Sequence, residues 1–280
     1  MDLGLRSARV LVTAASQGLG AATARRFSLE GAAVVINSRN LSELQDTASK
    51  INQESGNPVF TLAADLSDTA ATQKMVVNAA EMLGGLDVLI TNAGGSPGGT
   101  FDDFDLAAWE AATQLTLLSA VALVRAGLPY LRQSKRAAVL AIVSASAKQP
   151  SKNMTLTNAI RPAVVGLMKT LSQELAPQGI RVNSILPGSI DTARQIAVMD
   201  ARARKNNTSI EQERERAVAD VPLGRFGTPE EFANTAVFLC SPAAGFITGA
   251  AIPVDGGVTA HTGQPNLPRL FQSAAGGQAG

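Results

Sequence analysis

Residues 10–27 read VLVTAASQGLGAATARRF, and their pattern is the clearest indication of the fold in this chain. A short apolar run, 10–12, precedes a turn that holds Gly18 and Gly20. Residues 21–27 then have the spacing of a helix. Glycine lets a backbone approach a pyrophosphate closely, and the start of a helix offers free N–H groups and the positive end of its dipole. The stretch therefore predicts a strand, a phosphate-binding turn and a helix, in that order.

Similar apolar runs, rich in β-branched residues, recur along the chain and are separated by longer segments with helical spacing. The runs are 10–12, 33–36, 59–62, 88–90, 139–143 and 182–186. Such alternation indicates βαβ units, and right-handed crossovers give a parallel sheet with helices on both faces. We therefore expect an α/β fold with a doubly wound parallel sheet of the Rossmann type. Its ligand sites should lie at the carboxyl ends of the strands.

Length and composition favour one domain. The chain has 280 residues, 45% of them apolar, which suits a single doubly wound unit over residues 1–260. Residues 261–280 lack periodicity and are predicted to form a flexible tail. The 24 basic and 23 acidic residues leave a net charge of +1, which implies no nucleic-acid partner.

The sequence also predicts a cytoplasmic protein without a membrane partner. No run of 18 or more apolar residues is present, and the N-terminus has no signal-type apolar core. With one cysteine, Cys240, and one histidine, His261, we expect neither an internal disulfide nor a metal site. Cys240 follows an apolar run and is interpreted as a buried helix residue.

Residues 194–227 are charged and less regular than the rest. The charges gather at 202–205 and 211–216, and a charge run is usually a solvated helix face. Because the segment follows a strand end, it could also cover the active site as a lid. Both interpretations stay open.

The glycine turn resembles the TGxxxGxG signature of short-chain dehydrogenase/reductases, with Ala14 in place of the first glycine. Further motifs resembling that family follow in order. They are Asp65-Leu66, Asn92-Ala93-Gly94, Pro187-Gly188 with Thr192, Pro229-Glu230-Glu231, Thr248-Gly249 and Val254-Asp255-Gly256-Gly257. The resemblance covers residues 7–258 and is greatest to members similar to 3-oxoacyl-carrier-protein reductases. It implies a nicotinamide dinucleotide cofactor.

The resemblance places the cofactor-binding residues at the strand ends. They are Thr13, Ser16, Gln17, Gly18, Leu19, Gly20, Ser38, Arg39, Asp65, Leu66, Asn92, Ala93, Gly94, Pro187, Gly188 and Thr192. Asp65 would accept a hydrogen bond from the adenine amine, and Thr192 would contact the nicotinamide carboxamide or the pyrophosphate. Asn92 and Gly94 would line the floor of the site, although Asn92 could instead only shape a turn.

The residues after the second predicted strand decide between NADP and NAD. An acidic residue there accepts from the ribose 2′-hydroxyl, whereas a basic one binds a 2′-phosphate. Residues 37–40 contain no acid, and Ser38-Arg39 resembles the NADP-preferring members. We expect NADP, with Arg39 as the fork-shaped partner of the phosphate and NAD as the other option. Gln17 stands where many NADP enzymes have a second basic residue, and Arg39 could be only a surface charge.

The catalytic positions depart from the family pattern. Family members use a tyrosine, a lysine four residues later that lowers the phenol pKa, a serine and an asparagine. Residues 164–176 resemble the segment after that lysine. They place Thr157 at the tyrosine, Arg161 at the lysine, Ser144 at the serine and Thr116 at the asparagine. The sole tyrosine, Tyr130, ends a long helical segment and is interpreted as structural.

Thr157 cannot simply replace a tyrosine, because a hydroxyl is far less acidic than a phenol. Arg161 keeps its charge and suits an oxyanion, a carboxylate or a phosphate. A desolvated lysine, Lys152 or Lys148, could donate the proton, or both could be solvated loop charges. Alternatively, Ser144 and Thr157 bind a carbonyl oxygen while Arg161 stabilises negative charge and water supplies the proton.

Three functions remain open at this point. The first is an NADP-dependent oxidoreductase acting on a carbonyl or hydroxyl of a small molecule or acyl thioester. The second is a non-catalytic NADP-binding sensor or regulatory subunit. The third is a non-redox lyase or dehalogenase, because an arginine at the lysine position is similar to halohydrin dehalogenases, which however keep the tyrosine and alter the nucleotide loop.

Family members are commonly tetramers that assemble through two long helices, here about 106–131 and 154–178. Small apolar residues on the second of these, such as Ala159 and Ala163, fit a buried face. Ordinary core packing would give the same pattern. We expect a homotetramer.

Overall fold

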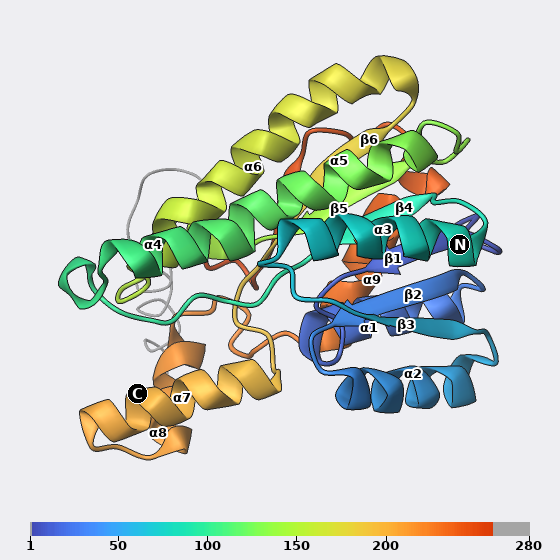
Figure 1. The fold of residues 1–280 in the computed structure, drawn as a ribbon. Coiled ribbons are helices and arrows are strands. Elements are labelled where there is room, and N and C mark those ends of the chain that lie inside the picture. Colours follow the sequence, from blue (N-terminus) through green and yellow to red (C-terminus); the bar gives the residue numbers. More distant parts are fainter. Residues whose placement is uncertain (1, 260–280) are drawn as a thin grey trace.

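The structure is a computed structural model that describes residues 2–259, so the predicted tail lies outside the described residues. Seven strands form one parallel sheet in the order β3-β2-β1-β4-β5-β6-β7 (Figure 1). The strands are β1 (Arg9–Val12), β2 (Ala33–Ser38), β3 (Val59–Ala63), β4 (Val88–Thr91), β5 (Ala138–Ile142), β6 (Arg181–Pro187) and β7 (Ala251–Val254). The predicted doubly wound α/β fold is confirmed.

Six strands coincide with the six predicted apolar runs, whereas β7 was not predicted as a strand. Its four residues are only half-buried and include Pro253, which has no N–H to donate to a ladder. Proline is tolerated there because β7 lies at the edge of the sheet and pairs only with β6. The pattern of a short, half-buried edge strand is too weak to be recognised.

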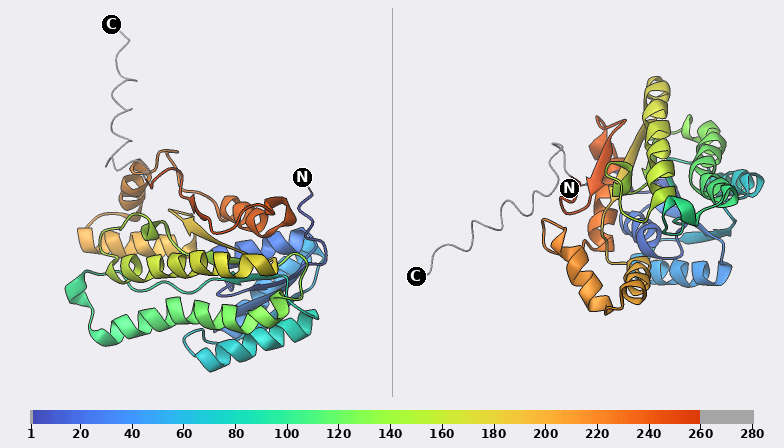
Figure 2. Two further views of the ribbon diagram at one scale, coloured as in Figure 1. Left: turned by 90° about the horizontal axis from the view of Figure 1, so that it is seen from above. Right: turned by 90° about the vertical axis from the view of Figure 1, so that its left-hand side faces the viewer.

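Helices cover both faces of the sheet (Figure 2). One face carries α1 (Gly18–Leu29), α2 (Leu41–Ser55) and α9 (Pro229–Cys240), and the other carries α3 (Thr69–Leu83), α5 (Ser119–Leu131) and α6 (Thr155–Leu175). Successive strand residues alternate between the two cores, since Val10 and Val12 face α1 and Leu11 faces α3. Full burial of such a side chain stabilises the fold by roughly 1.5–3 kcal/mol. Cys240 is buried in α9, as predicted.

A continuous helical segment, Leu106–Leu131, crosses one face of the sheet. It consists of α4 (Leu106–Thr113), a π-helical turn (Gln114–Leu118) and α5. By length and composition it is the one helix among residues 2–259 that could span a membrane. Here it packs against α3 and α6, with Leu123 and Val124 buried in the core shared with them. Core helices of globular proteins have the same features.

The charged segment 194–227 is more regular than expected, because it contains α7 (Ala193–Asn206) and α8 (Ile210–Ala219). The two helices form a hairpin set apart from the sheet, at the lower left in Figure 1. Most of its charges are exposed, as predicted for a solvated face. Glu213 is buried and accepts hydrogen bonds from Thr208 and Asn206. Asp200 and Arg214 are half-buried, and Arg214 forms a two-pronged ion pair with Asp191.

Candidate active site

The loops after β1 and β4 are joined at the point where the strand order reverses, which is where doubly wound sheets bind ligands. Thr13 is fully buried, and its hydroxyl donates to Asn92 O at 2.7 Å and accepts from Asn92 N at 2.9 Å. The Asn92 amide donates to Ala14 O at 3.1 Å. Both predicted residues therefore position the glycine turn, so the turn-shaping interpretation of Asn92 describes at least its side chain.

The glycine turn forms a cradle at the start of α1. Gly18 has a φ of 60°, and a Cβ built there would lie 3.9 Å from Thr192 Cγ2, so these two residues are neighbours at the cradle. A Cβ on Gly20 would overlap Ala14 O and lie 2.9 Å from Ala15 Cα. Ala14, which replaces a glycine of the signature, has a φ of 47°. The turn and the helix are thus packed backbone against backbone.

The cradle fits a pyrophosphate. No side chain caps the first turn of α1, and no acidic residue lies in it, so its N–H groups face outward unneutralised. Ser16, Gln17 and Thr192 line an open cavity of about 410 Å³ beside it. The side chains of two other predicted residues, Leu19 and Leu66, pack into the two cores, which leaves only their backbone to face the cradle.

Arg39 and Asp65 lie at the carboxyl ends of β2 and β3, where the adenosine half of a dinucleotide would bind. The Arg39 side chain is 79% exposed, and its Nη1 lies 3.9 Å from Asp65 Oδ2. Asp65 accepts from the backbone N and the hydroxyl of Ser67, and these bonds hold its pKa below the usual value. A carboxylate beside an exposed guanidinium suits an adenine amine and a 2′-phosphate, respectively.

Ser144 follows β5 and keeps a proton to donate. Its oxygen accepts hydrogen bonds from the Ser146 backbone N at 3.2 Å and from the Ser146 hydroxyl at 2.8 Å. Ser144 is the acceptor in both bonds, so its own O–H can donate to a substrate oxygen. Ser146 was not predicted as a site residue, because nothing in its sequence position distinguishes it from the other serines of the loop.

Thr157 and Arg161 lie one turn apart on the buried face of α6. The Thr157 hydroxyl makes no hydrogen bond within residues 2–259. Arg161 Nη1 donates to Ile142 O at 3.1 Å and Val143 O at 3.0 Å, and its Nη2 lies 3.5 Å from Gly94 O. Arg161 therefore binds the end of β5 immediately before Ser144 and fixes where that serine lies.

The Arg161 guanidinium is buried without an acidic partner among the described residues. Burial, together with the nearby positive charge of Arg194, lowers the pKa of Arg161 to about 10. The side chain is still cationic at neutral pH. It brings a fixed positive charge into a site of low dielectric, where that charge acts strongly on a developing oxyanion.

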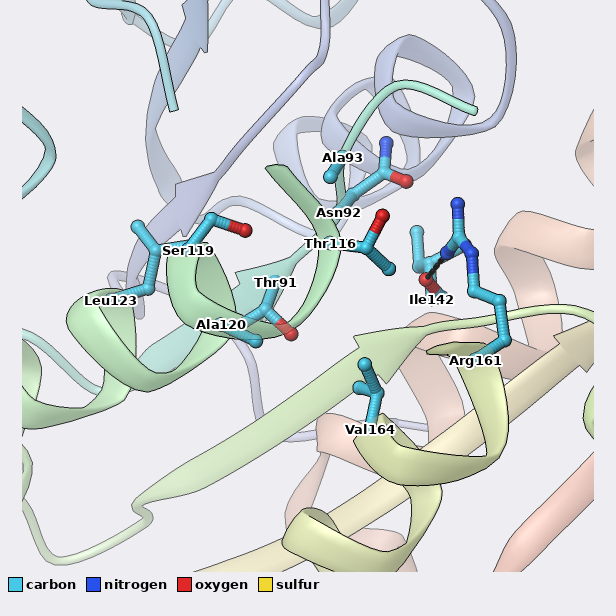
Figure 3. Close-up of a pocket in the computed structure, with 10 residues that line it drawn as sticks. All are labelled: Thr91, Asn92, Ala93, Thr116, Ser119, Ala120, Leu123, Ile142, Arg161 and Val164. Atoms are coloured by element: carbon cyan, nitrogen blue, oxygen red, sulfur yellow. Dashed lines mark hydrogen bonds between the residues drawn. The ribbon is translucent and has the colours of Figure 1, made fainter. Parts of the chain in front are cut away.

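Thr116 completes the group from the π-helical turn. It lines a cavity of about 10 Å³, room for about one water, together with Thr91, Asn92, Ser119 and Arg161. Figure 3 shows the Thr116 hydroxyl and the Asn92 amide on the same side as the Arg161 guanidinium. Single π-helical turns are frequent at functional sites, and this one places a hydroxyl where the resemblance expected an asparagine.

The two lysines considered as proton donors are not enclosed, and the sole tyrosine lies elsewhere. Lys148 and Lys152 are exposed on the loop after β5, without the burial that a lysine proton donor requires. Tyr130 packs against the core at the far end of α5, as its structural interpretation predicted. A residue that was not singled out, Arg194, reaches the loop after β4 and donates to Ser96 O at 3.3 Å. Arg194 could have been identified as a candidate from the sequence, because it lies two residues after the predicted site residue Thr192.

Comparisons with known proteins agree with this geometry. A family model described as enoyl-(acyl carrier protein) reductase matches residues 13–259. L-rhamnose 1-dehydrogenase (NAD(P)(+)) of Azotobacter vinelandii is 34% identical over 253 residues, which are 89% of this chain and 95% of that protein. NADPH-dependent reductase BacG of Bacillus subtilis is 34% identical over 248 residues, 88% of this chain and 95% of that protein.

Two solved structures are similar over nearly the whole chain. L-sorbose reductase from Gluconobacter frateurii, in complex with NADPH and L-sorbose, has a TM-score of 0.87 and 32% identity over 92% of this chain and 98% of that one. An NADPH-bound short-chain oxidoreductase from Pseudomonas aeruginosa, described as containing an atypical catalytic center, has a TM-score of 0.82 and 32% identity over 92% and 99%. This chain is an oxidoreductase of the short-chain dehydrogenase/reductase family.

Proposed function

We propose that the protein is an NADP-dependent oxidoreductase that reduces a carbonyl group, or oxidises the matching hydroxyl, with a catalytic set that lacks tyrosine and lysine. One observation carries the proposal. Ser144 retains a free proton, and the buried cationic Arg161 is bonded to the two carbonyls just before it. A site that only bound the cofactor would not need a buried, unpaired cation beside a free hydroxyl donor.

The residues divide the work as follows. When bound, NADPH supplies a hydride to the carbonyl carbon of the substrate. Ser144 and Thr157 donate hydrogen bonds to the carbonyl oxygen, and the Arg161 charge stabilises the negative charge that grows on it. Water then delivers the proton that completes the alcohol. Thr116 and the adjoining cavity, with its room for about one water, provide a place from which such a water enters.

NADP is the cofactor in this proposal, because the adenosine end has an exposed guanidinium, Arg39, and no acidic residue directly after β2. Two of the similar structures hold NADPH. Replacing Arg39 by methionine should weaken NADPH binding about 10- to 30-fold, because an exposed charge-assisted phosphate bond is lost. Fluorescence titration with NADPH and NADH checks this. NADH serves as the internal control and should bind the variant as it binds the wild type; equal weakening of both would contradict the assignment.

A turnover panel tests the function itself. Purified protein is first saturated with NADPH, and oxidation of NADPH is then followed against ketones, sugars, 2-oxo acids, acyl thioesters and quinones. We expect turnover with at least one class of carbonyl compound. Tight NADPH binding with no oxidation across the panel would contradict the oxidoreductase and support the sensor or regulatory-subunit alternative. Elimination of halide or water without cofactor would support the lyase alternative.

The remaining parts of the proposal concern the whole molecule. Residues 1–260 act as one domain in the cytoplasm, and four copies assemble through α4–α5 and α6. The exposed apolar residues Leu118 and Val121 on the first of these support such an interface. The hairpin of α7 and α8 covers the substrate, held at its base by the Arg214–Asp191 ion pair and by the stacking of Arg214 on Phe226.

A further inference from the structure

Two arginines from different helices converge on the loop after β4, residues 94–96. Arg161 of α6 places Nη2 3.5 Å from Gly94 O. Arg194 of α7 donates from Nη2 to Ser96 O at 3.3 Å. A Cβ on Gly95 would overlap the Arg194 guanidinium, so a larger residue there would displace that guanidinium from the loop. Both guanidiniums thus contact the carbonyls of one three-residue segment.

Neither cation is neutralised within the part of the chain that the structure describes. No carboxylate lies within ion-pair distance of Arg161 or Arg194 among residues 2–259. The acid closest to Arg194 in sequence, Asp191, is held by both Nη atoms of Arg214 at 2.9 and 2.6 Å. The main-chain carbonyls that the two guanidiniums bind are neutral and leave the positive charge uncompensated.

The two positive charges repel each other, and the charge of Arg194 contributes to the lowered pKa of Arg161. Arg161 is buried and Arg194 is exposed beside the same loop, so an anion bound next to Arg194 would also compensate the buried charge of Arg161. The strand order gives the place of that anion. The β4 loop lies between the glycine cradle after β1 and Ser144 after β5, so a group bound there adjoins both the cofactor and the reacting carbonyl.

We propose that Arg194 and Arg161 together bind a carboxylate of the substrate, so that the preferred substrates are carbonyl compounds carrying a carboxylate near the reacting carbon, such as 2-oxo acids. This inference rests on the proposed oxidoreductase function. Planar guanidinium forks match carboxylate geometry better than any neutral donor does. The cofactor pyrophosphate is the competing anion, but its cradle at Gly18 and Gly20 lies after β1 and has its own unneutralised helix N–H groups.

A binding experiment separates substrate recognition from turnover. N-propyl oxamate is a non-reducible isostere of a 2-oxo acid, and N-propyl oxamide is its neutral counterpart. Both are titrated calorimetrically into the full-length protein saturated with NADPH. We expect the oxamate to bind at least about 30-fold more tightly than the oxamide, because charged hydrogen bonds to two guanidiniums are involved.

Substitution of Arg194 identifies the group responsible. Arg194→Met should remove about tenfold or more of the oxamate affinity, leave oxamide affinity unchanged and leave the Kd for NADPH unchanged. Arg194→Lys should restore part of the loss, because it keeps the charge without the fork. Arg202→Met removes an exposed arginine from the same helix and should change none of the three affinities.

The outcomes are distinct. Equal binding of oxamate and oxamide by the wild type would overturn the inference, as would an Arg194→Met variant that loses NADPH affinity instead, which would assign Arg194 to the pyrophosphate. Oxamate binding that depends on Arg194, in a protein that reduces nothing, would support the carboxylate site and overturn the proposed reaction. Turnover of neutral ketones without preference for their carboxylate analogues would support the proposed reaction and overturn the carboxylate site.

Discussion

Gly20→Ala should abolish high-affinity NADPH binding, raising its Kd at least about 100-fold, which corresponds to roughly 3 kcal/mol. The added methyl group would overlap Ala14 O and lie 2.9 Å from Ala15 Cα, and both obstacles are backbone that cannot rotate away. Relief requires the glycine turn to move off α1, and the cradle for the pyrophosphate is formed by that contact. Overpacking of this kind also destabilises the fold by about 1–3 kcal/mol.

The measurement is fluorescence titration with NADPH, alongside circular dichroism to confirm that the variant is folded. Gly166→Ala is the matched control, because Gly166 lies inside α6 and nothing approaches within 4 Å of a Cβ built there. That control should bind NADPH as the wild type does and be stabilised by up to about 1 kcal/mol, since alanine is more favourable than glycine in a helix interior. An unchanged Kd in Gly20→Ala would mean that the turn does not hold the pyrophosphate.

The sheet could be predicted from the sequence because parallel, doubly buried strands leave a strong local signal. Runs such as 33–36 are apolar at every position and are bounded by helical spacing, and each of the six became a strand. The edge strand β7 left no such signal. Its position depends on pairing with β6, which is a tertiary contact that four half-buried residues with an internal proline do not encode locally.

The site divides in the same way. Residues whose role depends on the backbone, such as Gly18 and Gly20, could be placed from spacing alone because the turn chemistry is local. Arg194 could not, since its partner Ser96 lies 98 residues earlier in the chain and only the fold brings them together. The buried state of Arg161 is equally non-local. Its acceptors come from β5 and the β4 loop, so the sequence could suggest a cation there but not that it lacks a counter-charge.

Ser144→Ala should lower the single-turnover rate of NADPH oxidation about 10²- to 10³-fold, the usual effect of removing one donor to a developing oxyanion. No tyrosine is present in this site to donate a second hydrogen bond to the oxyanion. Ser144 is also the one predicted oxyanion donor whose oxygen is already held in place, because it accepts two hydrogen bonds. Stopped-flow mixing of the NADPH complex with the best substrate from the turnover panel measures this step directly. The NADPH Kd should not change.

Two further serine variants distinguish donation from packing. Ser119→Ala removes a hydroxyl that lines the small cavity beside Thr116 and Arg161 but donates to Leu115 O, and it should leave the rate within about twofold of the wild type. Ser146→Ala removes one of the two bonds that orient Ser144 and should slow the reaction by about fivefold, since the loss of one neutral hydrogen bond is worth about 1 kcal/mol. If Ser144→Ala and Ser119→Ala had equal rates, Ser144 would not contact the reacting oxygen, and Arg161 with Thr157 would have to stabilise it alone.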